Sequence, residues 1–392
     1  MTNILFLTAC ISDRNGPVGP CGSRDNPVLA PELSGRFQDI LNQVSDLPCL
    51  PDPEPFKEEL DTFIRHMLYS PTDLADIFTA VSAIHDRLTA RIISHHVDVF
   101  KARDRRPLPG PFCWISMGSD ARQEQVVRTD QDNALIYGDP PQSEEKKWDN
   151  YFADLARQVV TDLDRFGFAL CKGEVMATNP QWRRPLNRWH QALDQWIGSA
   201  EPADIRILTI LLDFRPIHGD FPMAQTIWDR VSGLFQENPV VNHYLTRDDF
   251  LFSSPKTVFG RIRTHRVKGC RTCFNIKTAG LAHLINAMRI LALNHGIFCP
   301  STLARMTALK DRGVLNSGEY DQCLDAFYHL NRLKIGSHLN RHRHPGLPVN
   351  CADLSGLTRT EKKNLKKVLD TVIHLQKRIR RTYTMRWMNF FN

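Results

Sequence analysis

Two aspartates separated by one residue are the strongest candidates for chemistry in this sequence. Asp130 and Asp132 follow the pair Gly118-Ser119, with eleven positions from Ser119 to Asp130. In an extended segment, residues i and i+2 lie on one face, so both carboxylates can hold one divalent cation. Hard oxygen ligands of this kind favour Mg²⁺ or Mn²⁺. A Gly-Ser turn that opens a helix offers backbone N–H groups and a hydroxyl that suit phosphates. The pattern therefore predicts a site for a metal-bound triphosphate that a hydroxyl attacks.

A third carboxylate from a neighbouring strand would complete such a metal site. We interpret the apolar run Ile205–Leu212 as a buried strand, which would place Asp213 at the rim of a sheet. Asp220, in the sequence His-Gly-Asp, is the alternative. We favour Asp213 because the end of a strand is a more rigid platform than a turn, and the alternative stays open.

The elements around these residues predict an α+β fold. Short apolar runs before turns predict further strands, and apolar residues at helical spacing predict helices on both sides of them. The predicted strands are 112–117, 133–137 and 205–213; the predicted helices are 31–44, 56–67, 71–102, 144–166, 274–297, 301–311, 317–334 and 359–381. The expected domains are a loop-rich segment 1–54, a helical lead-in 55–110, a core 111–223 and a C-terminal helical bundle 224–392 with a basic final helix.

Composition excludes several classes of protein. With 42% hydrophobic and 24% charged residues in 392 positions, the chain is neither disordered nor a small disulfide scaffold. Its net charge of +7 is concentrated in residues 358–392. Apolar residues recur there at helical spacing, which favours a helix packed on a bundle over a nucleic-acid-binding tail. We therefore do not expect nucleic acid as a partner.

The cysteines and the apolar segments indicate a soluble, cytoplasmic protein with reduced thiols. The pair Cys270-Arg-Thr-Cys273 lacks the second pair that a zinc site usually needs, and His265 and His283 lie at awkward distances from it. The apolar run Ile4–Ile11 is too short for a signal sequence and follows no Lys or Arg. Nowhere does an apolar stretch approach the roughly 18 residues that span a bilayer, so we expect no membrane partner.

The segment from Gly118 to Asn133 resembles the polymerase-β-like nucleotidyltransferases, whose hallmark is Gly-Ser, a spacer, Asp-x-Asp and a later Asp. It is more closely similar to the catalytic domain of the protein-PII uridylyltransferases. It most resembles a related nucleotidyltransferase family found behind cyclic-nucleotide-binding and CBS domains in bacterial signalling proteins. Further similar segments follow in the same order, so that the likeness covers about residues 55–380: Cys171–Trp182 with Trp189 and Trp196, Asp213–Asp220, and Ile276–Arg289.

The resemblance implies a polymerase-β-like core, a small mixed sheet with helices, and a role for each matching residue. Asp130, Asp132 and Asp213 would be the catalytic and metal-binding carboxylates. Gly118 and Ser119 would hold the β- and γ-phosphates.

For the remaining matches, a ligand role and a structural role are both open. Arg122, Arg128 and Lys277 would contact the triphosphate, but a structural Arg122–Glu124 pair or a solvated Lys277 would also fit. Trp182 and Trp189 would stack on a base or pack in the core.

By resemblance, the expected function is Mg²⁺- or Mn²⁺-dependent transfer of a nucleoside monophosphate from UTP or ATP to a hydroxyl, with a PII-like regulatory protein as acceptor. The alternatives are transfer to RNA or a small molecule, and an inactive nucleotide-binding scaffold. The sensor domains expected upstream in many relatives have no counterpart in residues 1–54. His85-Asp86 has no companion ligands in its helix, so we expect no activity that removes the nucleotide.

Overall fold

The computed structural model describes residues 26–45, 50, 52–199, 201–238, 241–249, 254–257, 259–267, 270–340 and 347–383. It forms two compact units. The described part of the N-terminal unit comprises residues 26–199 and 207–234, and that of the C-terminal unit comprises 201–206 and 235–383. The run Ile4–Ile11 and most of the loop-rich lead-in lie outside the described residues, as do residues 384–392 of the basic tail.

A four-stranded mixed sheet forms the centre of the N-terminal unit. Its strand order is β3-β2-β1-β4. The central strand β1 is antiparallel to both β2 and β4, and β2 is parallel to the short edge strand β3. The strands are β1 (Phe112–Met117), β2 (Asn133–Tyr137), β3 (Arg183–Pro185) and β4 (Phe214–Gly219). The predictions for 112–117 and 133–137 are confirmed.

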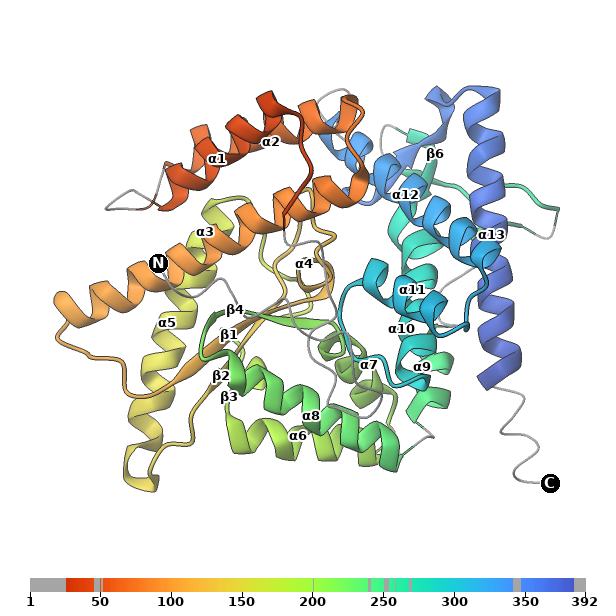
Figure 1. The fold of residues 1–392 in the computed structure, drawn as a ribbon. Coiled ribbons are helices and arrows are strands. Elements are labelled where there is room, and N and C mark those ends of the chain that lie inside the picture. Colours follow the sequence, from red (N-terminus) through yellow and green to blue (C-terminus); the bar gives the residue numbers. More distant parts are fainter. Residues whose placement is uncertain are drawn as a thin grey trace. The chain divides into compact units, whose positions relative to one another are not determined.

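Helices cover both faces of this sheet (Figure 1). On one face, Phe152 of α5 packs against Phe112 and Tyr137 of the sheet. On the other face, Trp228 of α8 stacks on Phe214 with ring centroids 4.5 Å apart. The helices of this unit are α1 (Pro31–Ser45), α2 (Pro53–Tyr69), α3 (Leu74–Ala102), α4 (Gly118–Ala121), α5 (Glu145–Arg165), α6 (Leu186–Ser199) and most of α8 (Phe221–Glu237). Two short 3-10 turns, Gln142–Glu144 and Pro180–Trp182, complete it.

The prediction of a strand at 205–213 is wrong, because this run forms helix α7 (Pro202–Leu211). A short, continuously apolar run does not by itself distinguish a buried strand from a buried helix. Ile205, Leu208, Leu211 and Leu212 are buried at spacings of three and four residues, as on one face of a helix with 3.6 residues per turn. The strand of this region is β4, which begins directly after Asp213.

The C-terminal unit is mainly helical, as expected. Its helices after α7 and α8 are α9 (Val241–Asp249), α10 (Ala282–Asn294), α11 (Thr302–Asp311), α12 (Ser317–Leu339) and α13 (Arg359–Tyr383). A π-helical turn, Lys277–Leu281, precedes α10, and a 3-10 turn, Leu354–Gly356, precedes α13. The apolar stripe of α13 is buried, so this basic helix packs within its unit. No described helix combines the length and apolar character that spanning a bilayer requires.

The sequence interpretation missed a second sheet in this unit. Three antiparallel strands, β5 (His265–Val267), β6 (Cys270–Asn275) and β7 (Cys351–Asp353), pair in the order β5-β6-β7. The first residues of the predicted helix 274–297 therefore belong to a strand. Two of the strands are only three residues long, too short for a clear alternating pattern.

Candidate functional site

The carboxyl end of β1 is flanked by an aspartate on each side. The N–H of Met117 donates to the carbonyl oxygen of Asp132 (2.9 Å), and the N–H of Gly118 donates to that of Asp213 (3.0 Å). Asp132 lies just before β2, and Asp213 lies just before β4. The antiparallel pairing of β1 with both neighbours thus brings residues far apart in sequence to one edge of the sheet, where β1 ends.

Buried amides set the orientation of the two aspartates before β2. The amide of Gln131 donates to the carbonyls of Val160 (3.1 Å) and Phe168 (2.9 Å), and Asn133 accepts from the N–H of Ala177 (2.9 Å). Gln131 and Asn133 are buried, whereas Asp130 and Asp132 are each half-buried. Alternation along an extended segment therefore directs the amides inward and leaves the carboxylates nearer the surface.

The thiol of Cys171 lies close to the two carboxylates. This neighbour was not predicted from the sequence. Its Sγ and one oxygen each of Asp130 and Asp132 lie within 4.8 Å of one another. Burial and the nearby Asp132 carboxylate raise the pKa of the Cys171 thiol, so the thiol stays protonated at neutral pH. The available signal was weak: Cys171 opens a segment used for the family resemblance, but a single cysteine has no diagnostic spacing.

Gly118 allows close approach of the backbone to Asp132. Its φ is +60°, a value that side-chain-bearing residues rarely adopt, and a Cβ there would lie 2.7 Å from Asp132 Oδ2. The helix that Gly118 and Ser119 open, α4, is a single turn. A phosphate at this point would meet the backbone N–H groups of one turn and the Ser119 hydroxyl, rather than the dipole of a long helix.

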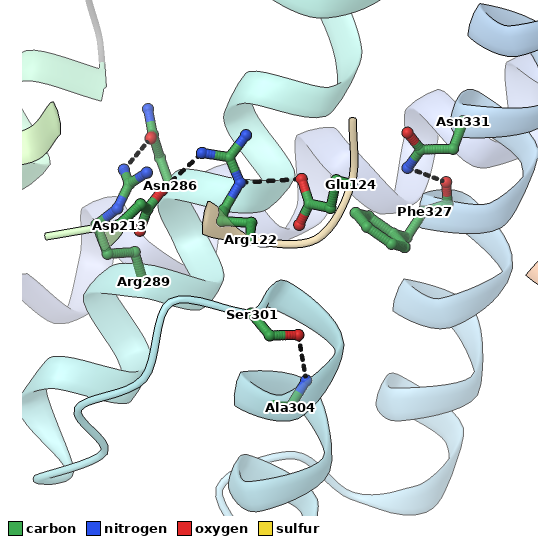
Figure 2. A network of polar contacts seen from close by, with 9 residues as sticks. All are labelled: Arg122, Glu124, Asp213, Asn286, Arg289, Ser301, Ala304, Phe327 and Asn331. Carbon is green, nitrogen blue, oxygen red and sulfur yellow. Dashed lines mark hydrogen bonds and ion pairs between the residues drawn. The ribbon is translucent and has the colours of Figure 1, made fainter. Parts of the chain in front are cut away.

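Asp213, the predicted third carboxylate, is held by an arginine. Its Oδ2 accepts from Arg122 Nη1 at 2.7 Å, and Arg122 Nε donates to Glu124 Oε2 at 2.9 Å (Figure 2). Asp213 is only 1% exposed. Burial disfavours the charge on Arg122, but its two carboxylate partners more than offset this and raise the pKa of the guanidinium. The Arg122–Glu124 pair that the sequence left open is therefore present, and Asp213 extends it to a buried triad.

Asp213 does not enter the group formed by Asp130, Asp132 and Cys171 among the residues that the structure describes. Asp220, the alternative third carboxylate, lies beyond the opposite end of β4, where its N–H donates to the carbonyl of Phe112 (2.8 Å). Of the two candidates, Asp213 is the one at the Gly118 edge. A metal-binding role for Asp213 stays a prediction.

Arg128 is turned toward the N-terminal helices. Its Nη2 forms an ion pair with Asp61 of α2 at 2.7 Å, and its side chain is only 9% exposed. This contact attaches α2 to the loop before Asp130. A triphosphate contact by Arg128 stays a prediction, whereas its structural role follows from this geometry.

The tryptophans form a core cluster, and Lys277 belongs to the C-terminal unit. Trp182, Trp189 and Trp196 are buried, with ring centroids 6.3–6.4 Å apart. Trp189 also donates to the carbonyl of Leu135 (3.3 Å). These contacts are those of core packing. Lys277 is exposed at the first residue of the π-helical turn, and its contact with a triphosphate stays a prediction.

A second, half-buried ion pair lies near the site and was not singled out from sequence. Arg215 of β4 donates to both carboxylate oxygens of Asp86 on α3, at 2.7 and 2.8 Å. Burial and the nearby Asp86 carboxylate raise the pKa of Asp120, which is next to Ser119 in the sequence. The charge of Arg215 opposes this rise but is weaker. Asp86 thus attaches α3 to the sheet, and the expected absence of a nucleotide-removing activity stays a prediction.

A hollow of about 500 Å³ lies elsewhere on the unit. It is lined by Tyr137, Lys146, Asp149 and Arg188, among others, and so lies at the far end of β2 from Asp132. Five strand residues span roughly 17 Å. This hollow is therefore separate from the group formed by Asp130, Asp132 and Cys171.

The donors at the Gly118 edge fit a hard divalent cation. Asp130 and Asp132 supply carboxylate oxygens, and the close approach at Gly118 leaves backbone N–H groups near them. Cys171 adds a softer donor that, while protonated, is a poor ligand for Mg²⁺. The two carboxylates could thus hold Mg²⁺ or Mn²⁺, next to the Gly118-Ser119 turn that would bind phosphate.

Two family models match the chain. Residues 58–203 match the model described as "Putative nucleotidyltransferase DUF294". Residues 239–383 match the model described as "Putative nucleotidyltransferase substrate binding domain". Together the matches span most of the chain and confirm the resemblance to a nucleotidyltransferase family. No curated protein matches the chain.

Proposed function

The chain belongs to the family described as "Putative nucleotidyltransferase DUF294", and on this basis we propose that it transfers a nucleoside monophosphate from a nucleoside triphosphate to a hydroxyl group. The observation that carries the proposal is the convergence of Asp130 and Asp132 beside the Gly118-Ser119 turn. In this reaction the acceptor oxygen bonds to the α-phosphorus, the bond to the β-phosphate oxygen breaks, and pyrophosphate leaves. The hydroxyl proton passes to solvent.

Asp130 and Asp132 would hold the divalent cation, Mg²⁺ or Mn²⁺, which when bound neutralises charge on the triphosphate. The Ser119 hydroxyl and the N–H groups of the α4 turn would orient the β- and γ-phosphates. Asp213 and Arg122 would keep the end of β4 in place next to Gly118, because their ion pair is buried and close.

The proposed donor is UTP or ATP, and the proposed acceptor is a PII-like regulatory protein in the cytoplasm. Support for the acceptor comes from the resemblance to the protein-PII uridylyltransferases, and not from a residue of this chain. The buried apolar stripe of α13 supports a protein acceptor over RNA, because that basic helix is used for packing.

The test is a transfer assay with α-phosphate-labelled UTP or ATP, Mg²⁺ and a PII-like protein. We expect label on the acceptor and an equal amount of pyrophosphate, and neither with the double variant Asp130→Asn, Asp132→Asn. Asp139→Asn is the matched control, since this exposed aspartate follows the other end of β2. Label on added RNA in place of protein would favour the RNA alternative. Nucleotide binding without transfer to any acceptor would favour an inactive scaffold and contradict the proposal.

A further inference from the structure

Each strand of the small sheet in the C-terminal unit contributes one side chain to a single cluster. His265 comes from β5, Cys273 from β6 and Cys351 from β7. One potential ligand atom from each lies within 4.8 Å of the other two. His265 pairs directly with Cys273, and Cys351 pairs with Asn275, two positions further along β6. Residues two apart on a strand share a face, so the register brings the three side chains together.

The two distances from the imidazole nitrogen to the sulfurs suit tetrahedral zinc. His265 Nε2 lies 3.3 Å from Cys273 Sγ and 3.9 Å from Cys351 Sγ. Zinc bound to sulfur and to imidazole nitrogen at its usual bond lengths places those two atoms roughly 3.5 Å apart. The imidazole nitrogen therefore faces both sulfurs at ligand spacing, which a disulfide alone would not require.

The sheet buries few apolar side chains: Phe274 and Ala352 are buried in its strands, besides the cluster around the cysteines. Its buried cluster consists of Cys270, Cys273, Leu347 and Cys351, with Val267 packed against it. Small elements with so few buried side chains are commonly held by a metal or a disulfide. The site is also reachable, because His265 is exposed while both cysteines are buried.

We propose that His265, Cys273 and Cys351 bind one zinc ion in the reduced chain and that this ion fastens the three strands to one another. Binding displaces the two thiol protons to solvent, since zinc takes thiolate ligands. Cys273 and Cys351 are joined as a disulfide in the structure. The disulfide and the zinc site use the same two sulfur atoms, so each form excludes the other. Among the described residues three supply ligand atoms, which leaves the fourth position of the ion to water.

Cys270 offers a matched control within the same cluster. It is buried beside Cys273 and Cys351 but does not belong to the ligand group. Its thiol is hydrogen-bonded to the carboxylate of Asp353 instead. Replacing Cys270 by serine therefore perturbs the same core without removing a proposed ligand.

The experiment measures zinc by mass spectrometry in untagged full-length protein purified under reducing conditions, followed by cobalt substitution. We expect one equivalent of zinc, and with cobalt the visible bands of a tetrahedral site with sulfur ligands. Cys273→Ser and Cys351→Ser should weaken zinc binding on the order of a hundredfold or more. His265→Asn should also weaken it, and Cys270→Ser should retain it. Because His265 is exposed, its variant tests the site even where a buried cysteine variant fails to fold.

Two outcomes would overturn the proposal. One is a reduced protein that neither contains zinc nor binds added zinc or cobalt, which would leave the disulfide as the sole link between β6 and β7. The other is zinc retained equally by His265→Asn and by both cysteine variants, which would place the metal elsewhere in the chain.

Discussion

An aspartate lies on each side of Gly118, one just before β2 and one just before β4, and the two have different surroundings. On the β2 flank, Asp132 lies with Asp130 and the thiol of Cys171. On the β4 flank, Asp213 is buried and ion-paired with Arg122. The backbone carbonyls of both aspartates accept hydrogen bonds from the end of β1. The two aspartates therefore lie at the same edge of the sheet, and their position does not explain why their surroundings differ. The difference lies in their neighbours. Arg122 forms an ion pair with Asp213, whereas Asp132 lies close to a second carboxylate, that of Asp130.

This comparison suggests a division of labour. A buried carboxylate neutralised by an arginine stabilises the fold, and two carboxylates close together attract an external cation. Variants on the β2 flank should therefore impair transfer while leaving stability nearly unchanged. Variants on the β4 flank should mainly lower the free energy of unfolding.

The largest effect is expected on the β2 flank. The double variant Asp130→Asn, Asp132→Asn should lower the transfer rate on the order of a thousandfold, because metal neutralisation of the triphosphate contributes several kcal/mol. The measurement is the initial rate of pyrophosphate release, with Asp139→Asn as control. A double variant as active as Asp139→Asn would show that Asp130 and Asp132 are not needed for transfer.

On the β4 flank, Arg122→Ala should reduce the free energy of unfolding by about 3–5 kcal/mol, because Asp213 and Glu124 would each lose their ion pair with Arg122 at a buried position. Denaturant unfolding measures this. Arg157→Ala is the control: its ion pair with Asp154 is on the surface, and its loss should cost less than about 1 kcal/mol. Equal losses in the two variants would show that the Arg122 triad does not stabilise the fold.

Gly118 lies between the flanks, and Gly118→Ala should affect both properties. A Cβ would meet Asp132 Oδ2 and would require a strained backbone, costing about 1–2 kcal/mol of stability. Displacement of the Asp132 carboxylate should lower the transfer rate about tenfold or more. Gly198→Ala is the control, because nothing lies within 4 Å of its added methyl group in α6. If the two variants behave alike, the close approach at Gly118 has no role.

Per pH unit, the smallest effect concerns His85 of α3. Burial, together with the charge of Arg128, lowers the pKa of His85 to about 3. The unfolded chain therefore binds a proton on His85 between about pH 6.5 and 3, and the folded chain does not. Stability should fall as the pH falls through this window, by at most about 1.4 kcal/mol per unit from this group. His85→Leu should flatten the pH dependence of denaturant unfolding. An unchanged slope would show that His85 is protonated in the fold.

Sequence patterns predicted the two strands beside the candidate site better than the elements around them. The strands 112–117 and 133–137 and the positions of Gly118, Asp130 and Asp132 could be predicted, because each depends on local alternation and turn chemistry. The strand predicted at 205–213 failed because an apolar run suits a buried helix equally well. The partners of Arg122 and Cys171 depend on contacts across the sheet, which local spacing does not specify. The same holds for His265 and Cys351, which are 86 positions apart.

The central claim is that Asp130 and Asp132 bind a metal–triphosphate complex. The most direct test is the thermal unfolding midpoint with Mg²⁺ and each of ATP, GTP, CTP and UTP, in the wild type and in the Asp130→Asn, Asp132→Asn variant. A nucleotide at a hundredfold over its dissociation constant adds about 2.7 kcal/mol, which raises the midpoint by several degrees. The account predicts a Mg²⁺-dependent rise with UTP or ATP that is lost in the variant. No rise with any nucleotide, or an equal rise in the variant, would contradict it.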